Sequence, residues 1–552
     1  MSRLDRLIAT GLLLLLGTPM LWAAAAAVLA GGSGAAWQAL LADPQTWRAL
    51  GMTLFTGLLA TGLSVALAAW LLSRHFPGPA WAGLVRLCSP LLAVPHAAFA
   101  IGLVFLIAPS GWVLRWLSPW ASGLQTPPPW STTQDPWGLG LVAVLVAKEV
   151  PFLLWAAATQ LQRMDVAERW TRELQVARSL GYTPHTAWWR VLWPQLWPRL
   201  RWPLLAVLAY SLTVVDMALI IGPTSPPTLA VLAWQWLLDA TRERNAQGAA
   251  AAWLLAGAVA GAAALLQGAA TAAHWRTRWT QGQRGVVRSR GRLGRALARV
   301  DGGAFVALVL LYGAVMLALA VGSVSGYWPF PAVWPATWTL QAWVSVAGSA
   351  STVGTTLTLA LSSAATALLW AVAWLECAPK RWQAAVNRVI YLPLVLPPVL
   401  WVVGVHGLAL HWHIDTTWRG VWLAHTLAAT PYVLLALSPA YAGFDRRLWH
   451  VTASLGHRRA VFLMRVKWPL LRAALLASFA IGFAVSVAQY LPTLFVGAGR
   501  LATVTTEAVT LASGAQRSLT SAYAWLQWLL PVVVFGLAAW LGQPRSFKNK
   551  SS

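Results

Sequence analysis

The sequence is short of the residues that usually give a protein a polar surface or a chemical site. Only 10% of its 552 residues are charged, and 15 acidic residues stand against 40 basic ones. It has only two cysteines, Cys88 and Cys377, which are too few for a disulfide framework. None of its five lysines follows a glycine, which excludes the Gly-Lys-Ser/Thr loop that cradles nucleotide phosphates. We therefore predict no nucleotide site and no cofactor in this chain.

A metal site is not expected either. The triplet His411-x-His413-x-Asp415 would align its three side chains only on a strand, and no fourth ligand is apparent. A cluster of histidines at a membrane interface is the better interpretation.

Apolar residues are what the chain has in excess, at 58% of the total. Apolar runs of about 20 residues recur, each long enough to cross about 30 Å of hydrocarbon as a helix. We therefore expect an all-α polytopic membrane protein with about 12 transmembrane helices. The expected spans are 7–30, 50–72, 87–108, 139–161, 202–221, 249–273, 304–325, 350–375, 386–410, 419–441, 472–496 and 522–541.

The basic residues are unevenly shared between the alternate loops. The side that holds both termini carries 32 Lys or Arg, the opposite side carries seven, and Lys148 lies inside a span. By the positive-inside rule, this bias predicts that both termini are cytoplasmic. The basic residues behind the formal charge of +25 are thus explained by membrane topology. We therefore do not expect nucleic acid as a partner. Residues 7–30 exceed the usual apolar length of a signal peptide, which favours a retained anchor.

One polar pattern occurs twice, each time between long apolar runs. The first copy is Gln175-Val-Ala-Arg-Ser-Leu-Gly181 followed by Val191-Leu-Trp-Pro194, and the second is His450-Val-Thr-Ala-Ser-Leu-Gly456 followed by Val466-Lys-Trp-Pro469. In both copies the glycine precedes the proline by 13 positions. We expect a helix that ends at Gly181 in the left-handed conformation. Thr183-Pro184 should then cap and open a second, short helix that runs to Leu192.

This duplicated pattern resembles the cytoplasmic coupling loop of type I binding-protein-dependent ABC importer permeases. The loop of that family reads Glu-Ala-Ala, three residues, Gly, nine residues and Ile-x-Leu-Pro. The residues that match or nearly match it are Ala177, Gly181, Val191 and Pro194 in the first copy and Gly456, Val466 and Pro469 in the second. Ala453 is a further candidate residue of the second loop. Gln175 and His450 stand where the family has its glutamate.

The resemblance implies a fused pair of permease domains, similar to the thiamine and ferric-iron permeases, that encloses one solute path. It also implies a transport subunit of the inner membrane, not an enzyme. Its partners would be a cytoplasmic ABC ATPase in two copies, which docks on the two loops, and a periplasmic solute-binding protein. Membrane lipid is the remaining expected partner.

Repetition outside the loops sets the expected domain boundaries. Gly51-Met-Thr-Leu54 returns as Gly354-Thr-Thr-Leu357, which indicates a duplicated helical bundle. The expected divisions are an anchor and external loop at 1–45, a first permease domain at 46–275, a basic linker with an extra transmembrane helix at 276–344, a second permease domain at 345–541 and a cytoplasmic tail at 542–552.

Four polar residues within or beside spans are candidates for the substrate path: Lys148, Glu149, Asp216 and Gln489. Charged residues inside a membrane are costly, so they are usually either paired or functional. A structural role between helices is as good an interpretation of Lys148 and Glu149 as a role in the path. Glu149 and Asp216 favour a cationic solute and Lys148 an anionic one, which leaves the substrate open.

Three other classes of protein fit the sequence less well. A secondary transporter of the major facilitator type also has 12 spans, but the loop from Ser73 to Arg86 lacks the Asp-Arg-x-Gly-Arg turn of that group. A membrane enzyme would need more ionisable residues in its spans. A membrane scaffold leaves the matched loops unexplained.

Overall fold

A computed structural model describes residues 3–78, 80–161, 164–271, 303–394, 396–445, 447–514 and 516–543. Throughout these residues the regular structure is helical, and the β contact found there is an isolated bridge between Ser325 and Trp338. The all-α prediction is confirmed. The basic stretch expected to link the two halves, up to residue 302, and the tail from residue 544 lie outside the described residues.

Nine helices in the described ranges are long and apolar enough to cross a membrane. A bent pair, Arg459–Leu470 and Arg472–Val487, brings the number to ten if it counts as one span. The expected spans 202–221, 386–410 and 472–496 are each interrupted, after Thr213, around Pro397 and after Val487. Proline has no N–H and cannot continue the preceding turn, which accounts for the break at Pro397; hydropathy does not reveal such breaks.

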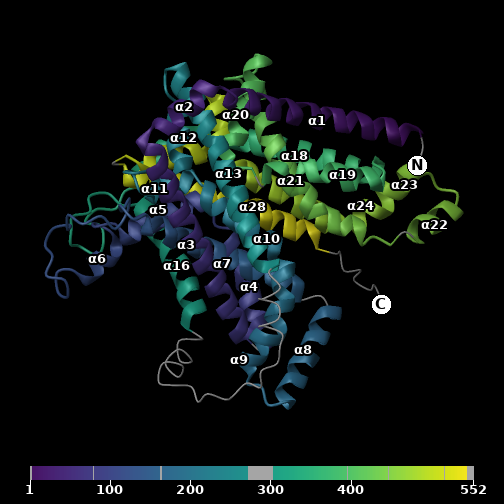
Figure 1. The fold of residues 1–552 in the computed structure, drawn as a ribbon, viewed down its shortest axis with the longest axis horizontal. Coiled ribbons are helices and arrows are strands. Elements are labelled where there is room, and N and C mark those ends of the chain that lie inside the picture. Colours follow the sequence, from purple (N-terminus) through teal and green to yellow (C-terminus); the bar gives the residue numbers. More distant parts are fainter. Residues whose placement is uncertain are drawn as a thin grey trace, which may run out of the picture. The chain divides into compact units, whose positions relative to one another are not determined.

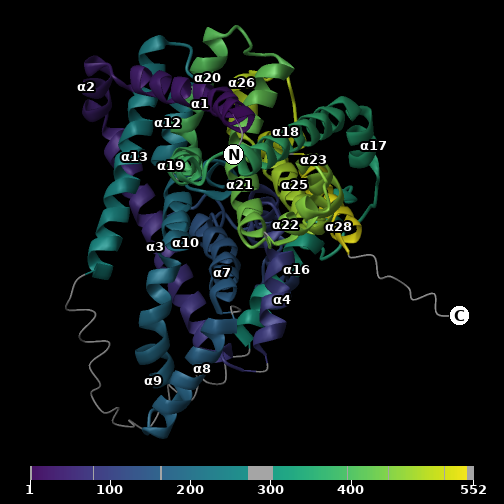
Figure 2. The same ribbon diagram turned by 90° about the vertical axis from the view of Figure 1, so that its right-hand side faces the viewer.

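The first of two compact units contains residues 30–343 and 512–522. Figure 1 shows α3, α7 and α10 side by side, with α8 and α9 beyond one end of them, and Figure 2 shows the same from the side. The helices within this unit are α2 (Gly34–Ala42), α3 (Pro44–His75), α4 (Trp81–Leu92), α5 (His96–Ile107), α6 (Trp112–Leu117), α7 (Leu139–Leu161), α8 (Met164–Ser179), α9 (Pro184–Ala187), the π-helical turn η1 (Trp188–Leu192), α10 (Trp193–Thr213), α11 (Asp216–Ile221), α12 (Leu229–Leu237), α13 (Arg242–Thr271) and α16 (Gly303–Ser323).

The second unit contains residues 1–29, 344–511 and 523–552. Its helices are α1 (Arg3–Gly31, up to residue 29), α18 (Ala350–Cys377), α19 (Lys380–Ile390), the 3₁₀ turn η2 (Leu392–Leu394), α20 (Pro398–His411), α21 (Trp418–Ala442), α22 (Arg447–Ser454), α23 (Arg459–Phe462), the π-helical turn η3 (Leu463–Lys467), α24 (Trp468–Leu470), α25 (Arg472–Val487), α26 (Leu491–Gly497) and most of α27 (Val504–Ala512). The division between the units falls within α17 (Gln341–Gly348) and α28 (Arg517–Gly542). The core of this unit is built by α18, α21 and α25.

Each repeat packs against a helix that lies outside it in the sequence. Helix α1 precedes the first repeat, yet its Ala9, Leu16 and Met20 are buried in the core of the second unit, and the Trp370 indole donates to the Leu12 carbonyl at 3.0 Å. Helix α16 precedes the second repeat, yet it packs on α5 in the first unit. There the Tyr312 hydroxyl donates to the Ala147 carbonyl of α7 at 3.1 Å.

One buried hydrogen bond is repeated in the two units. The backbone N–H of Leu229, which opens α12, donates to the Thr53 hydroxyl at 2.7 Å, and that of Val504, which opens α27, donates to the Thr356 hydroxyl at 2.9 Å. Each hydroxyl in turn donates to the carbonyl four residues earlier in its own helix. The first N–H groups of a helix have no partner within that helix. The threonine of the repeated Gly-x-Thr-Leu sequence therefore supplies a hydrogen-bond acceptor for the first N–H of each helix.

We expect Thr53→Val and Thr356→Val to destabilise the protein by about 1–3 kcal/mol each, because valine keeps the shape but leaves a buried N–H without an acceptor. Thermal unfolding of the purified protein in detergent measures this loss. Thr358→Val is the matched control, since Thr358 is exposed and its hydroxyl donates only to carbonyls of its own helix. Equal loss in Thr356→Val and Thr358→Val would show that the repeated bond is unimportant.

Candidate functional site

The first duplicated loop turns at a glycine, as its sequence predicts. Helix α8 ends at Ser179, and Gly181 has φ +91°. The N–H of Tyr182 donates to the Ala177 carbonyl at 3.1 Å and that of Gly181 to the Arg178 carbonyl at 3.0 Å, which is the Schellman pattern of a helix end. The Thr183 hydroxyl then accepts the N–H of Thr186 and caps α9.

The second loop repeats this geometry in the second unit. Gly456 has φ +78°, the N–H of His457 donates to the Thr452 carbonyl at 3.2 Å, and that of Gly456 to the Ala453 carbonyl at 3.0 Å. Helix α23 and the turn η3 follow Gly456 in the same register in which α9 and η1 follow Gly181. Two loops of the same fold thus lie at the same point of two membrane bundles. In both cases the left-handed glycine sets the direction of the short helix.

A π-helical turn and a proline complete both loops. Val191 lies in η1 and Val466 in η3, while Pro194 and Pro469 each stand at the second position of the α-helical segment that follows. A proline ring clashes with the carbonyl four residues earlier in a regular α-helix. The wider π turn directly before each proline relieves that clash, so the expected short helix is α-helical only in its first four residues.

Exposed apolar side chains occupy matching positions in both loops. Val176 and Leu180, which precede Gly181, are 59% and 73% exposed. Val451 and Leu455 stand at the same positions before Gly456 and are 57% and 70% exposed. We call these four residues the apolar tips. Exposed apolar side chains that recur at matching positions on two polar loops mark candidate contact surfaces. The sequence pattern did not single them out, because an apolar residue in a predicted helix is normally expected to face the core.

The remaining residues proposed for the loops lie around the same turn. Gln175 and His450 are both exposed. Ala177 is buried, and the equivalent buried position in the second loop belongs to Thr452, whose hydroxyl donates to the Leu448 carbonyl at 2.7 Å. Ala453 is exposed.

Lys148 lies in α7 and contacts the break between α4 and α5. Its Nζ donates to the Val94 carbonyl at 2.6 Å and to the Leu91 carbonyl at 3.4 Å. The same atom lies 5.4 Å from the centroid of the Tyr312 ring and 5.8 Å from that of Phe99. The ammonium group thus satisfies carbonyls that the break in the helix frees. Its neighbour Glu149 is also buried in α7.

Asp216 and Gln489 both lie where a span is broken. Asp216 is the first residue of α11, shortly after α10 ends, in the first unit. Gln489 lies between α25 and α26 in the second unit. Non-helical backbone at membrane depth is tolerated where it is buried in protein or lines a cavity.

A buried polar network at the second of these breaks was not foreseen from the sequence. In α21, His425 lies 2.7 Å from the Ser486 hydroxyl through Nδ1 and 2.8 Å from the Thr493 hydroxyl through Nε2. The Thr493 hydroxyl donates to the Gln489 carbonyl at 2.8 Å, so it accepts from Nε2–H. Nδ1 then accepts from Ser486. The network joins α21 to both sides of the break.

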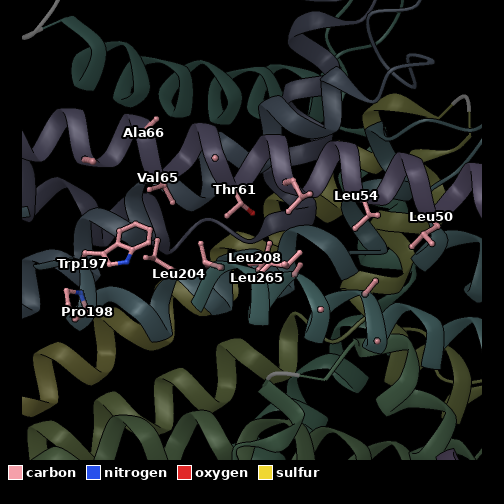
Figure 3. Close-up of a pocket in the computed structure, with 18 of the residues that line it drawn as sticks. Leu50, Leu54, Thr61, Val65, Ala66, Trp197, Pro198, Leu204, Leu208 and Leu265 are labelled. Atoms are coloured by element: carbon pink, nitrogen blue, oxygen red, sulfur yellow. The ribbon is translucent and has the colours of Figure 1, made fainter. Parts of the chain in front are cut away.

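A cleft of about 1090 Å³ lies between α3, α10 and α13 in the first unit. In Figure 3, Leu50, Leu54 and Val65 face Leu204, Leu208 and Leu265 across it. The polar side-chain groups in its lining are the Thr61 hydroxyl, which donates to the Gly57 carbonyl, and the N–H groups of five tryptophans. Such a lining suits hydrocarbon and does not suit a charged solute.

Comparison with known proteins gives a relative that matches almost the whole chain. Over 519 residues, the chain is 35% identical to the inner membrane ABC transporter permease protein YnjC of Escherichia coli (strain K12), and the match covers 92% of this chain and 91% of that protein. No family model matches the chain.

Two further relatives match shorter stretches. A probable molybdenum ABC transporter permease of Haloferax volcanii is 33% identical over 129 residues, which is 22% of this chain and 48% of that protein. The molybdenum transport system permease protein ModB of Haemophilus influenzae is 28% identical over 154 residues, which is 24% of this chain and 67% of that protein.

Proposed function

The chain belongs to the ABC transporter permeases, and we propose that it forms both halves of the solute path of one importer. The observation that carries this proposal is a pair of loops, one in each repeat, with the same hydrogen bonds, the same left-handed glycine and the same π turn. A permease chain with a single half would need only one such loop.

We propose that each loop docks on one copy of a separate ABC ATPase in the cytoplasm. The apolar tips would enter a groove on the ATPase, since they are large apolar side chains exposed on both loops at matching positions. The chain has no Gly-Lys-Ser/Thr loop of its own, so hydrolysis is assigned to that subunit. Closure of the two ATPases would then move the short helices and the spans attached to them.

The solute would arrive on an external binding protein and pass the broken spans. Discontinuous helices in transporters present free backbone groups and helix ends to a substrate. Asp216 and Gln489 stand at such breaks and are the best candidates to line the path. Glu149 remains a candidate in α7, whereas the bonds of Lys148 to two carbonyls favour a structural role.

Orientation is part of the proposal. Both termini and both loops are placed in the cytoplasm and the Pro- and Trp-rich segment 119–137 outside, in the inner membrane, because the basic residues are concentrated on the first side.

A matched pair of serines tests this orientation. Ser131 in the external segment and Ser179 beside Gly181 are both exposed. In a chain with Cys88 and Cys377 replaced by serine, we expect Ser131→Cys to react with a membrane-impermeant thiol reagent in intact cells and Ser179→Cys to react only after lysis. Labelling of Ser179→Cys in intact cells would overturn the cytoplasmic placement of the loop.

The loops themselves are tested at their glycines. A Cβ at Gly181 or Gly456 would meet no neighbouring atom, so a substitution there acts through the backbone alone. We expect Gly181→Val and Gly456→Val to strain the turn by about 1–2 kcal/mol or more and to misdirect the short helix. Co-purification of the ATPase should fall, while the yield of inserted protein stays near normal.

Gly181→Asn is the control, because asparagine tolerates positive φ far better than valine. We expect it to retain the ATPase. If both valine variants retained the ATPase as well as the unaltered chain does, the loops would be connectors and the importer proposal would lose its support.

A further inference from the structure

Charged side chains gather where the second loop meets the membrane helices of its own unit. The Arg459 guanidinium of α23 donates to Asp5 Oδ1 of α1 at 2.6 Å and to the backbone carbonyl of Glu376 in α18 at 2.7 Å. Lys467 Nζ of η3 lies 2.7 Å from Glu376 Oε1 and 4.4 Å from the centroid of the Tyr441 ring. Figure 1 shows the first turn of α1 near α23.

Three of these four side chains are largely removed from water. The side chains of Asp5 and Glu376 are each 10% exposed and that of Lys467 is 14% exposed, while that of Arg459 is 41% exposed. Exposed ion pairs contribute little to stability, but removal of one partner from a buried pair leaves an uncompensated charge. The two negative charges and the two positive charges of this group cancel. The four residues form one cluster, which we call the loop anchor.

The loop anchor joins three separate elements. Asp5 comes from α1, Glu376 from the last turns of α18, and both basic residues from the second loop. Since α1 and α18 also pack in the core of this unit, the anchor links the loop directly to membrane-spanning helices.

The first loop carries uncharged residues where the anchor has its two basic groups. When Gly181 is aligned with Gly456, Pro184 stands at the position of Arg459 and Leu192 at that of Lys467. The first loop instead has hydrogen bonds between its own two sides, which we call the amide brace. Gln195 accepts from the Trp170 indole at 3.0 Å and donates to the Glu173 carboxylate at 2.6 Å. That brace joins α8 to α10, the two helices on either side of the turn.

We propose that the loop anchor is a rigid joint through which the second loop moves α1 and α18 when the ATPase acts. Arg459 is its central positioning residue, since it binds both helices at once. The inference rests on the proposed function, because it assigns the loop a moving partner. It adds that the two loops are attached to their membrane helices by different chemistry, and that neutralising charge uncouples only the second.

A double-mutant cycle tests whether the joint exists, without any ATPase. We expect Asp5→Asn and Arg459→Gln each to lower the unfolding temperature of the purified chain, and the double variant to lose no more than the worse single variant. Arg458→Gln is the control, because Arg458 is the exposed neighbour of Arg459 and carries the same charge. Additive losses, or an equal loss in Arg458→Gln, would overturn the anchor.

A distance measurement then tests whether the joint transmits movement. Spin labels are placed at Leu7→Cys on α1 and Arg447→Cys on α22, both exposed, in the chain without its native cysteines and in complex with the ATPase. We expect the same label distance without nucleotide and with ATP, because loop and helix move together. In Arg459→Gln the distance should change with ATP, and in Arg458→Gln it should not.

The two ways to fail are distinct. If the unaltered chain does not bind the ATPase, the proposed function is wrong, and the joint with it. If the ATPase binds but ATP changes the distance in the unaltered chain, or leaves it unchanged in Arg459→Gln, only the joint is wrong.

Discussion

Backbone polar groups have no water to bond with inside a membrane, and this constraint shapes the fold. Several spans are nevertheless broken, so side chains must satisfy the backbone groups that the breaks release. Thr53 and Thr356 do so at the start of α12 and α27, and Lys148 does so at the end of α4. At the break before α26 the task falls to Thr493, held by His425. The breaks thus give these buried polar side chains a structural role.

The two halves share a geometry but differ in how they hold their loops. The turn is repeated down to its backbone hydrogen bonds, which supports the proposal that the two loops meet two copies of one partner. The attachment to the membrane helices differs between the two loops. An amide brace holds the first loop and the Asp5–Arg459–Glu376–Lys467 cluster holds the second.

What could be predicted from the sequence is what depends on nearby residues. The helical membrane class follows from the apolar runs, and the left-handed Gly181 and Gly456 and the cap at Thr183 follow from local backbone preferences. The bond from Leu229 to Thr53 spans 176 residues and that from Arg459 to Asp5 spans 454, and no local pattern encodes either. The apolar tips were missed because exposure is a property of the folded chain.

The central claim is that one chain supplies both halves of an importer, and the composition of the complex tests it most directly. Native mass spectrometry of the complex with the ATPase, purified in detergent, counts the chains of each kind. We predict one permease chain with two ATPase subunits. A complex of two permease chains with two ATPase subunits would contradict the account, because each chain would then use a single loop.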